Sequence, residues 1–161
     1  MLNFLFPRLT PARGSDLFAS ITDMARQPHW YQSGGAADTI DGRFRVLATL
    51  TALALVRLDQ LGAAGEAGSV ALTERFVEVM EAEHRELGLG DPTLGKTVRK
   101  LVGALGKRVA LWRGAVGGSG VWDDVAAESL AGTAHSSGAL REFWQDIARL
   151  GVEELMEGRL H

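Results

Sequence analysis

The sequence predicts an all-α protein, a single compact bundle of about six helices with a buried central helix. Apolar residues recur at spacings of three and four, and no segment shows the alternation of a β-strand. An uncharged apolar run extends from Val46 to Val56. It is much shorter than the ~20 residues that a bilayer span needs, so it suits the middle of a bundle. The length of 161 residues fits one domain with one core.

The first residues differ in character from the rest, and we expect an N-terminal apolar arm at 1–14 followed by a helical domain at 15–161. The start MLNFLFPRLTP has no basic region, is interrupted by Pro7 and precedes no small-residue cleavage site, so it does not match a signal peptide. The chain contains no cysteine, which excludes a disulfide framework and fits a reducing compartment. We expect a cytoplasmic bacterial protein that can attach to the surface of the inner membrane.

The first helix of the domain is predicted from Ser15, a good N-cap residue, to about Gln27, because Pro28 disfavours helix before it. A loop follows at 29–42, aromatic at first and then rich in Gly, Ala and Asp. The central helix begins after a capping residue, Asp38 or Asp41, and ends near Gly62.

The next segment, GAAGEAGS at 62–69, is predicted to be a flexible connector. An acidic amphipathic helix then covers Ser69–Leu87. Its apolar stripe consists of Leu72, Phe76, Val79, Met80 and Leu87.

An Asp-Pro pair at 91–92 provides a cap and a first-turn proline, and the helix that it starts should run to about Trp112. A glycine-rich turn is predicted at 114–120. A short helix over Trp122–Leu130 and a last helix over Ala139–Glu157 complete the bundle.

The residues Gly90–Thr97 satisfy the pattern GxxxxGK[ST] of a phosphate-binding loop. Such a loop follows a strand and places its Gly-Lys pair at the start of a helix. Here a charged helix precedes the motif, Pro92 lacks an N–H, and the predicted helix starts before Gly95. We therefore expect no bound nucleotide and interpret the segment as a helix junction. Its shape is assigned to Gly88, Gly90, Asp91 and Gly95.

The helix after this junction has a cationic side. Between Pro92 and Trp122 there is no acidic residue, and six basic residues are present: Lys96, Arg99, Lys100, Lys107, Arg108 and Arg113. An apolar stripe is formed by Leu94, Val98, Leu101, Leu105, Val109 and Trp112. Lys96, Lys100 and Lys107 fall opposite this stripe, and Arg99 lies beside them.

Two interpretations of this cationic side remain open. It can be solvated, or pair with the acidic helix that carries Glu74, Glu78, Glu81, Glu83 and Glu86. Alternatively, it docks on an anionic surface such as lipid headgroups, RNA or an acidic partner.

The aromatic pair formed by Trp30 and Tyr31 also has two interpretations. At least one of the two side chains is expected to plug the end of the bundle. The alternative is a contact surface for an apolar segment of a partner.

The titratable residues do not form a recognisable catalytic or metal site. The four histidines, at positions 29, 84, 135 and 161, show no metal-ligand spacing. Glu81 and His84 form one ExxH motif, whereas a di-iron bundle needs two such motifs and two further glutamates. No nucleophile signature is present. We expect no catalytic residue, no metal and no cofactor, and the net charge of −3 indicates no general attraction to DNA.

Two segments together resemble the ubiquinol–cytochrome c chaperone family. Trp30–Phe44, WYQSGGAADTIDGRF, is similar to the family's aromatic–loop–DTxDGRF element. Met80–Leu101, MEAEHRELGLGDPTLGKTVRKL, is similar to its element with LRE, a GD pair and a later GK. The resemblance covers roughly Asp16 to Trp112. Within it, the family usually has aliphatic or glycine residues where this chain has the pair at 92–93.

The resemblance implies an all-helical, non-enzymatic assembly factor for respiratory complex III, with cytochrome b or another subunit of that complex as its client. In the first segment, the matching positions are Trp30, Tyr31, Asp38, Thr39, Asp41, Gly42, Arg43 and Phe44. In the second, they are Arg85, Glu86, Gly88, Gly90, Asp91, Gly95, Lys96, Val98, Arg99 and Lys100.

The matching residues divide by expected role. Arg43 is expected to bridge the first loop to an acid, while Asp38, Asp41 and Gly42 shape that loop. The candidates for partner contact are Trp30, Tyr31, Arg43, Lys96, Arg99, Lys100 and Lys107.

Three hypotheses of function follow. The first is an assembly chaperone that binds a membrane-protein client through the cationic helix and the aromatic loop. The second is a peripheral module that binds anionic lipid without a dedicated client. The third is a nucleotide-binding protein that uses Gly90–Thr97.

Overall fold

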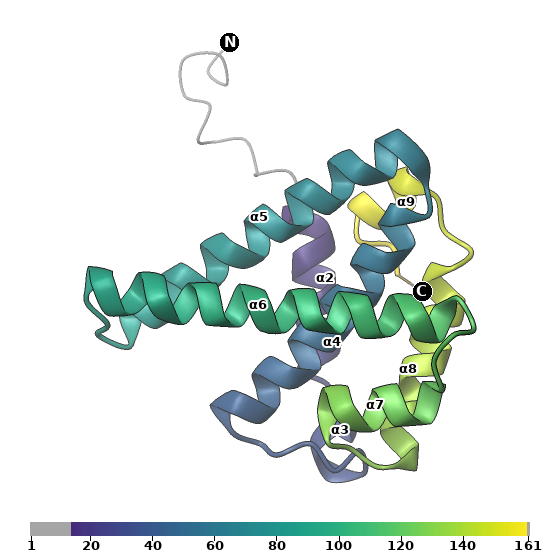
Figure 1. Ribbon diagram of the computed structural model, residues 1–161, viewed down its shortest axis with the longest axis horizontal. Helices are drawn as coiled ribbons and strands as arrows, with labels where there is room; N and C mark the ends of the chain where they lie inside the picture. Colours follow the sequence, from purple (N-terminus) through teal and green to yellow (C-terminus); the bar gives the residue numbers. More distant parts are fainter. Residues whose placement is uncertain (1–13, 161) are drawn as a thin grey trace.

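Residues 14–160 are described by a computed structural model, and within them every regular element is a helix (Figure 1). The eight helices of this range are α2 (Ser15–Ala25), α3 (His29–Gln32), α4 (Ile40–Asp59), α5 (Gly62–Glu86), α6 (Asp91–Val116), α7 (Trp122–Leu130), α8 (Ala134–Ile147) and α9 (Val152–Met156). The all-α prediction is confirmed. Most of the predicted N-terminal arm, residues 1–13, lies outside the described residues.

The central helix is α4, which contacts α2, α5, α6, α7 and α8. Within the apolar run predicted to be buried, Leu47 alone is only half-buried. The buried hydroxyls of Thr49 and Thr51 donate to the carbonyl oxygens of Arg45 and Leu47, at 2.7 and 2.8 Å, so they need no partner elsewhere in the core.

The cap of α4 is Thr39, whose Oγ1 accepts a hydrogen bond from the Gly42 N–H at 3.1 Å. The prediction that Asp38 or Asp41 caps this helix is therefore wrong. Asp38 precedes the cap, and Asp41 lies inside the first turn, where a carboxylate is favoured by the helix dipole. Both aspartates pair with arginines instead.

The segment predicted to be a flexible connector is the helical start of α5. Gly65 and Gly68 are buried there because α4 approaches closely. A Cβ on Gly65 would lie 1.9 Å from the carbonyl oxygen of Leu58, and one on Gly68 would lie 3.0 Å from the Leu58 Cδ2. These glycines therefore allow close packing instead of flexibility.

The apolar stripe of α5 is confirmed for Leu72, Phe76 and Met80, which are all buried, and Val79 packs against the core. Leu87 does not belong to it. This residue follows the helix and is 62% exposed, because the chain turns away from the core there.

Further boundaries differ from the prediction. Helix α6 runs to Val116, into the predicted glycine-rich turn, and α8 begins at Ala134, before the predicted Ala139. The segment at 29–42 contains one helical turn, α3, packed beside the end of α2. The predicted last helix is divided into α8 and α9 at Gly151, whose backbone is extended. Nearby, Arg57 of α4 donates a hydrogen bond to the carbonyl oxygen of Leu150 at 2.9 Å. This bond gives a partner to a backbone carbonyl group at the point where the helix is interrupted.

The helices α5 and α6 form a hairpin whose turn lies at one edge of the molecule (Figure 1). Helix α6 crosses over α4, and the C-terminal helices α7 to α9 lie toward the opposite edge. Within residues 14–160, no helix combines the length and apolar character of a membrane span.

Candidate functional site

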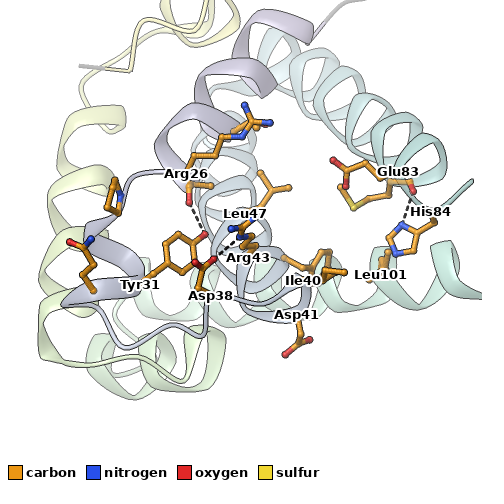
Figure 2. Close-up of a pocket in the computed structure, with 16 residues that line it drawn as sticks. Arg26, Tyr31, Asp38, Ile40, Asp41, Arg43, Leu47, Glu83, His84 and Leu101 are labelled. Atoms are coloured by element: carbon orange, nitrogen blue, oxygen red, sulfur yellow. Dashed lines mark hydrogen bonds and ion pairs between the residues drawn. The ribbon is translucent and has the colours of Figure 1, made fainter. Parts of the chain in front are cut away.

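A groove of about 900 Å³ opens between the end of α2, α3, the start of α4, the second half of α5 and α6 (Figure 2). Its lining residues are Thr22, Ala25, Arg26, Pro28, Tyr31, Gln32, Asp38, Ile40, Asp41, Arg43, Phe44, Leu47, Met80, Glu83, His84 and Leu101. They come from segments far apart in the sequence, so the groove exists only in the folded chain.

One wall of the groove is built by the aromatic segment. The Tyr31 hydroxyl donates to the Ala25 carbonyl oxygen at 2.8 Å, which ties α3 to the end of α2. Burial raises the pKa of Tyr31, opposed by nearby Arg43, so this side chain stays a neutral phenol at pH 7. Trp30 instead points into the core, where it is 2% exposed and its Nε1 donates to Met24. In this conformation Trp30 plugs the bundle and is closed to a partner.

The rim of the groove carries charge. Arg43 Nε donates to Asp38 Oδ1 at 2.7 Å, so Arg43 pairs with an acid of the first loop itself. The hydrogen bond to Asp38 raises the pKa of Arg43. Asp41 pairs with Arg45 at 2.8 Å. These pairs are largely solvent-exposed and add little stability. Only the Asp38–Arg43 pair ties the loop to α4, since Asp41 and Arg45 both belong to that helix.

The floor of the groove is apolar. Phe44 and Leu47 of α4 and Leu101 of α6 are each half-buried, and Met80 of α5 lies beneath them. Ile40, at the start of α4, is 71% exposed. In Figure 2, it lies between the wall that carries Tyr31 and the wall that carries Glu83 and His84. An apolar segment could therefore cover side chains that are now hydrated.

His84 belongs to the second wall. Its Nδ1 lies 2.8 Å from the carbonyl oxygen of Met80, which can only accept, so Nδ1 carries the proton. Within residues 14–160 no group of three or more His, Asp or Glu side chains gathers as in a metal centre.

All of the GxxxxGK[ST] segment after its first glycine lies inside a helix. Helix α6 begins at Asp91, with Gly90 as its N-cap, and Leu94 N–H already donates to the Gly90 carbonyl oxygen at 2.7 Å. Gly95 and Lys96 are therefore beyond the first turn and do not frame a phosphate site. This agrees with a helix junction.

The roles assigned within the junction need correction. Asp91 is the first helical residue and not the cap, and Gly95 lies within α6 and not in the loop. Only Gly88, with a φ of +89°, has a backbone conformation here that side chains disfavour. A Cβ on Gly90 would meet no atom within 4 Å, so space does not require a glycine there.

The two faces of α6 match the sequence analysis. Leu94, Val98, Leu105 and Trp112 are buried, and the remaining members of the stripe are half-buried. On the outer face, the side chains of Lys96, Arg99 and Lys100 are exposed, and no acid of the described chain lies within ion-pair distance of them.

The other cations of α6 have partners outside α5. Lys107 pairs with Glu128 at 3.6 Å, and Arg113 pairs with Asp59 at 3.1 Å. Arg108 turns inward, donates to the Ser129 carbonyl oxygen at 2.9 Å and lies 5.9 Å from the centre of the Phe44 ring. Burial lowers its pKa, although the guanidinium remains charged. Among described residues, the acids of α5 therefore form no ion pair with α6.

The structure brings some predicted site residues together and separates others. Tyr31, Asp38, Asp41 and Arg43 line the groove, whereas Lys96, Arg99, Lys100 and Lys107 lie outside its lining. The sequence analysis missed the apolar floor, because Leu47, Met80 and Leu101 belong to regular helical stripes. Nothing in a stripe shows which of its members a groove leaves open.

The groove unites the chain's two most distinctive segments, since Trp30–Phe44 supplies one wall and Met80–Leu101 supplies the other. A family model described as ubiquinol-cytochrome C chaperone matches residues 32–135, which include most of both segments. The chain belongs to this family. The match confirms the resemblance inferred from the sequence and gives the coarse function, a chaperone in the assembly of ubiquinol–cytochrome c reductase, complex III.

Among solved structures, this family member is similar to the crystal structure of the Cbp3 homolog from Brucella abortus. The similarity has a TM-score of 0.71 at 24% identity and covers 98% of this chain and 94% of that chain. At this identity, it supports the fold. No curated protein matches the sequence.

Proposed function

We propose that this protein is a non-enzymatic chaperone that binds cytochrome b, or another complex III subunit, in the groove between α3 and the α5–α6 hairpin. The observation that carries the proposal is that both family segments line this one groove. Its apolar floor and charged rim suit an apolar helix that ends in polar groups.

The groove has the chemistry for such a client, and its volume is about 900 Å³. Exposed Ile40 and half-buried Leu47 and Leu101 give a helix an apolar surface to cover. Tyr31, Asp38 and Arg43 at the rim can bond to polar groups where the apolar helix ends.

The cationic face of α6, defined by Lys96, Arg99 and Lys100, supplies the second part of the proposed surface. Cations without partners attract acidic loops of a client and the anionic headgroups around it. We therefore infer that the protein works in the cytoplasm, at the inner-membrane surface, where a membrane-protein client emerges.

Site-specific photo-crosslinking in living cells tests the groove. A photoreactive residue replaces Ile40 at the groove, and a matched probe replaces Val121, which is similarly exposed at 63% but precedes α7 outside the groove. We expect crosslinks to cytochrome b from position 40 and not from position 121. Equal crosslinking from both positions, or none from position 40 in cells that assemble complex III, contradicts the proposal.

A second candidate, a lipid-binding module without a dedicated client, is favoured by the turn of the hairpin. Leu87 is 62% exposed there, close in sequence to the cationic face of α6. Vesicle flotation separates the two candidates when combined with a deletion strain. Strong binding to anionic vesicles together with normal cytochrome b after deletion favours the lipid module.

A further inference from the structure

A pair of histidines that is not part of the groove lining joins α3 to α8. His29 Nδ1 lies 3.1 Å from His135 Nε2, although the two residues are 106 positions apart. The rings meet edge to face, with centroids 5.3 Å apart. The sequence predicts no metal site because no two histidines have ligand spacing. The fold nevertheless brings these two imidazoles together.

The backbone around both histidines is held by a clasp between the segments 33–34 and 133–136. Thr133 donates from its N–H to the Gly34 carbonyl oxygen and from its Oγ1 to Ser33, both at 2.9 Å. Ser136, which is 1% exposed, donates a third bond to Gly34 at 2.5 Å. Since His29 precedes one segment of this clasp and His135 lies within the other, their separation is fixed by the fold.

The clasp is also tightly packed. A Cβ on Gly34 would lie 2.4 Å from the carbonyl oxygen of Trp30, and one on Gly132 would lie 2.7 Å from Ser136 Oγ. These glycines allow the two segments to approach. The backbone positions that carry the two imidazoles are therefore fixed relative to each other, while the rings themselves lie at the surface.

The hydrogen bonds of His29 select its tautomer. His29 Nε2 lies 3.1 Å from the Gln27 Oε1, and an acceptor at this place favours the tautomer with the proton on Nε2. Nδ1 then presents a lone pair toward His135. Burial and the neighbouring His135 lower the pKa of His29, while Glu142 acts in the opposite direction. The lowered pKa keeps the imidazole neutral at pH 7. A metal-binding histidine typically has such a second partner on its other nitrogen.

We propose that His29 Nδ1 and His135 Nε2 bind one divalent transition-metal ion, Zn²⁺ or Cu²⁺. Two imidazole nitrogens at about 2.0–2.1 Å from a tetrahedral ion are roughly 3.3 Å apart, close to the separation of 3.1 Å in this structure. On binding, His135 changes tautomer: its Nε2 gives a proton to solvent and its Nδ1 takes one up, so both ligands remain neutral imidazoles. Since no third side chain within residues 14–160 completes a cluster, water fills the remaining positions.

The bound ion would crosslink α3 to the start of α8. This link lies two residues from Tyr31 in the sequence, so it would also stiffen one wall of the groove. Copper should bind more tightly than zinc, because affinity at nitrogen ligands follows that order. The site stands on the histidine geometry and does not depend on the identity of the client.

Isothermal titration of the full chain with Zn²⁺ and with Cu²⁺ tests the site, alongside thermal unfolding. We expect one ion per chain and a rise in Tm that Mg²⁺ does not produce. His29→Gln and His135→Gln should each weaken binding at least ten-fold, while His84→Gln, which changes a histidine outside the pair, should leave it unchanged.

Several results would overturn the site. One such result is that neither Zn²⁺ nor Cu²⁺ binds to the wild-type chain. Another is that a folded variant of either histidine binds the ion as tightly as the wild type. If a substitution prevents folding, the site is tested on the wild-type chain by NMR. NMR of its imidazole protons must then show two rings perturbed together by one equivalent of Zn²⁺, and perturbation of a single ring, or of none, rejects the pair.

Discussion

Thr39 and Gly42 define how the loop with the charged rim enters the central helix. The hydroxyl of Thr39 accepts from the Gly42 N–H, and Gly42 packs against the Ala37 carbonyl group. Each residue therefore has a separate physical task, one as a cap and the other as a close contact. Both tasks can be tested by single substitutions.

Replacing the cap should destabilise the protein by a modest amount. Thr39→Ala removes the acceptor for the Gly42 N–H, and we expect the free energy of unfolding to fall by about 1 kcal/mol in urea titrations. Thr39→Ser keeps the oxygen and should cost less. A larger loss for Asp38→Ala than for Thr39→Ala would show that the aspartate, and not the threonine, stabilises the helix start.

Replacing Gly42 tests the close contact. A Cβ there would lie 1.8 Å from the Ala37 carbonyl oxygen, so Gly42→Ala should lower the free energy of unfolding by about 1–3 kcal/mol. Gly103→Ala is the matched control, because Gly103 is also helical but a Cβ added to it would meet no atom within 4 Å. The control should be neutral or stabilise by up to about 1 kcal/mol. Equal effects in urea titrations would contradict the contact.

Single residues also show where sequence reasoning was limited. Asp38, Thr39 and Asp41 are all capping types, and local spacing does not decide among them. The decision comes from tertiary structure, where both aspartates find arginines. The histidine pair is a stronger case, since only the fold brings positions 29 and 135 together.

At the scale of elements, the regular apolar patterns were the reliable part of the prediction. The buried run of α4, the two faces of α6 and the bounds of α7 were predicted because each depends on helical periodicity. The start of α5 was not. Gly65 and Gly68 have flexible composition, but the contact with Leu58 that requires small residues is invisible in one sequence. The break at Gly151 was also missed, because the hydrogen bond that the Leu150 carbonyl oxygen accepts there comes from Arg57 of α4, far away in the sequence.

Helix α6 offers a test of its exposed cationic face. Lys96→Glu combined with Lys100→Glu should leave the fold intact, because both side chains are exposed and lack partners within the described chain. We expect association with the membrane-bound client to be lost and complex III to be depleted. Circular dichroism checks the fold, and blue-native electrophoresis measures the complex.

The matched control for this double variant reverses the same amount of charge elsewhere. Arg149→Glu with Arg159→Glu changes two exposed cations near α9, away from the turn of the hairpin (Figure 1). This control should assemble complex III normally. Normal complex III in cells that carry only the α6 variant would rule out the role of its cationic face.

At the scale of the whole molecule, the groove depends on a topology that periodicity does not reveal. One wall comes from the segment after α2 and the other from α5, with the central helix between them. The sequence identified both segments as family elements without showing that they face each other. Because the two segments face each other in the folded chain, two motifs that are distant in the sequence can serve one function. The sequence of each motif alone does not predict this arrangement.

A client that fills the groove should protect both walls at once. Hydrogen exchange measured with and without detergent-solubilised cytochrome b should show slower exchange in residues 26–44 and 80–101 together, since both segments border the same space. Helices α7 and α9, which contribute no lining residue, serve as the internal control and should exchange unchanged. Protection of only the α6 segment would place the client on the cationic face alone. Uniform protection would instead indicate general stabilisation without a defined groove contact.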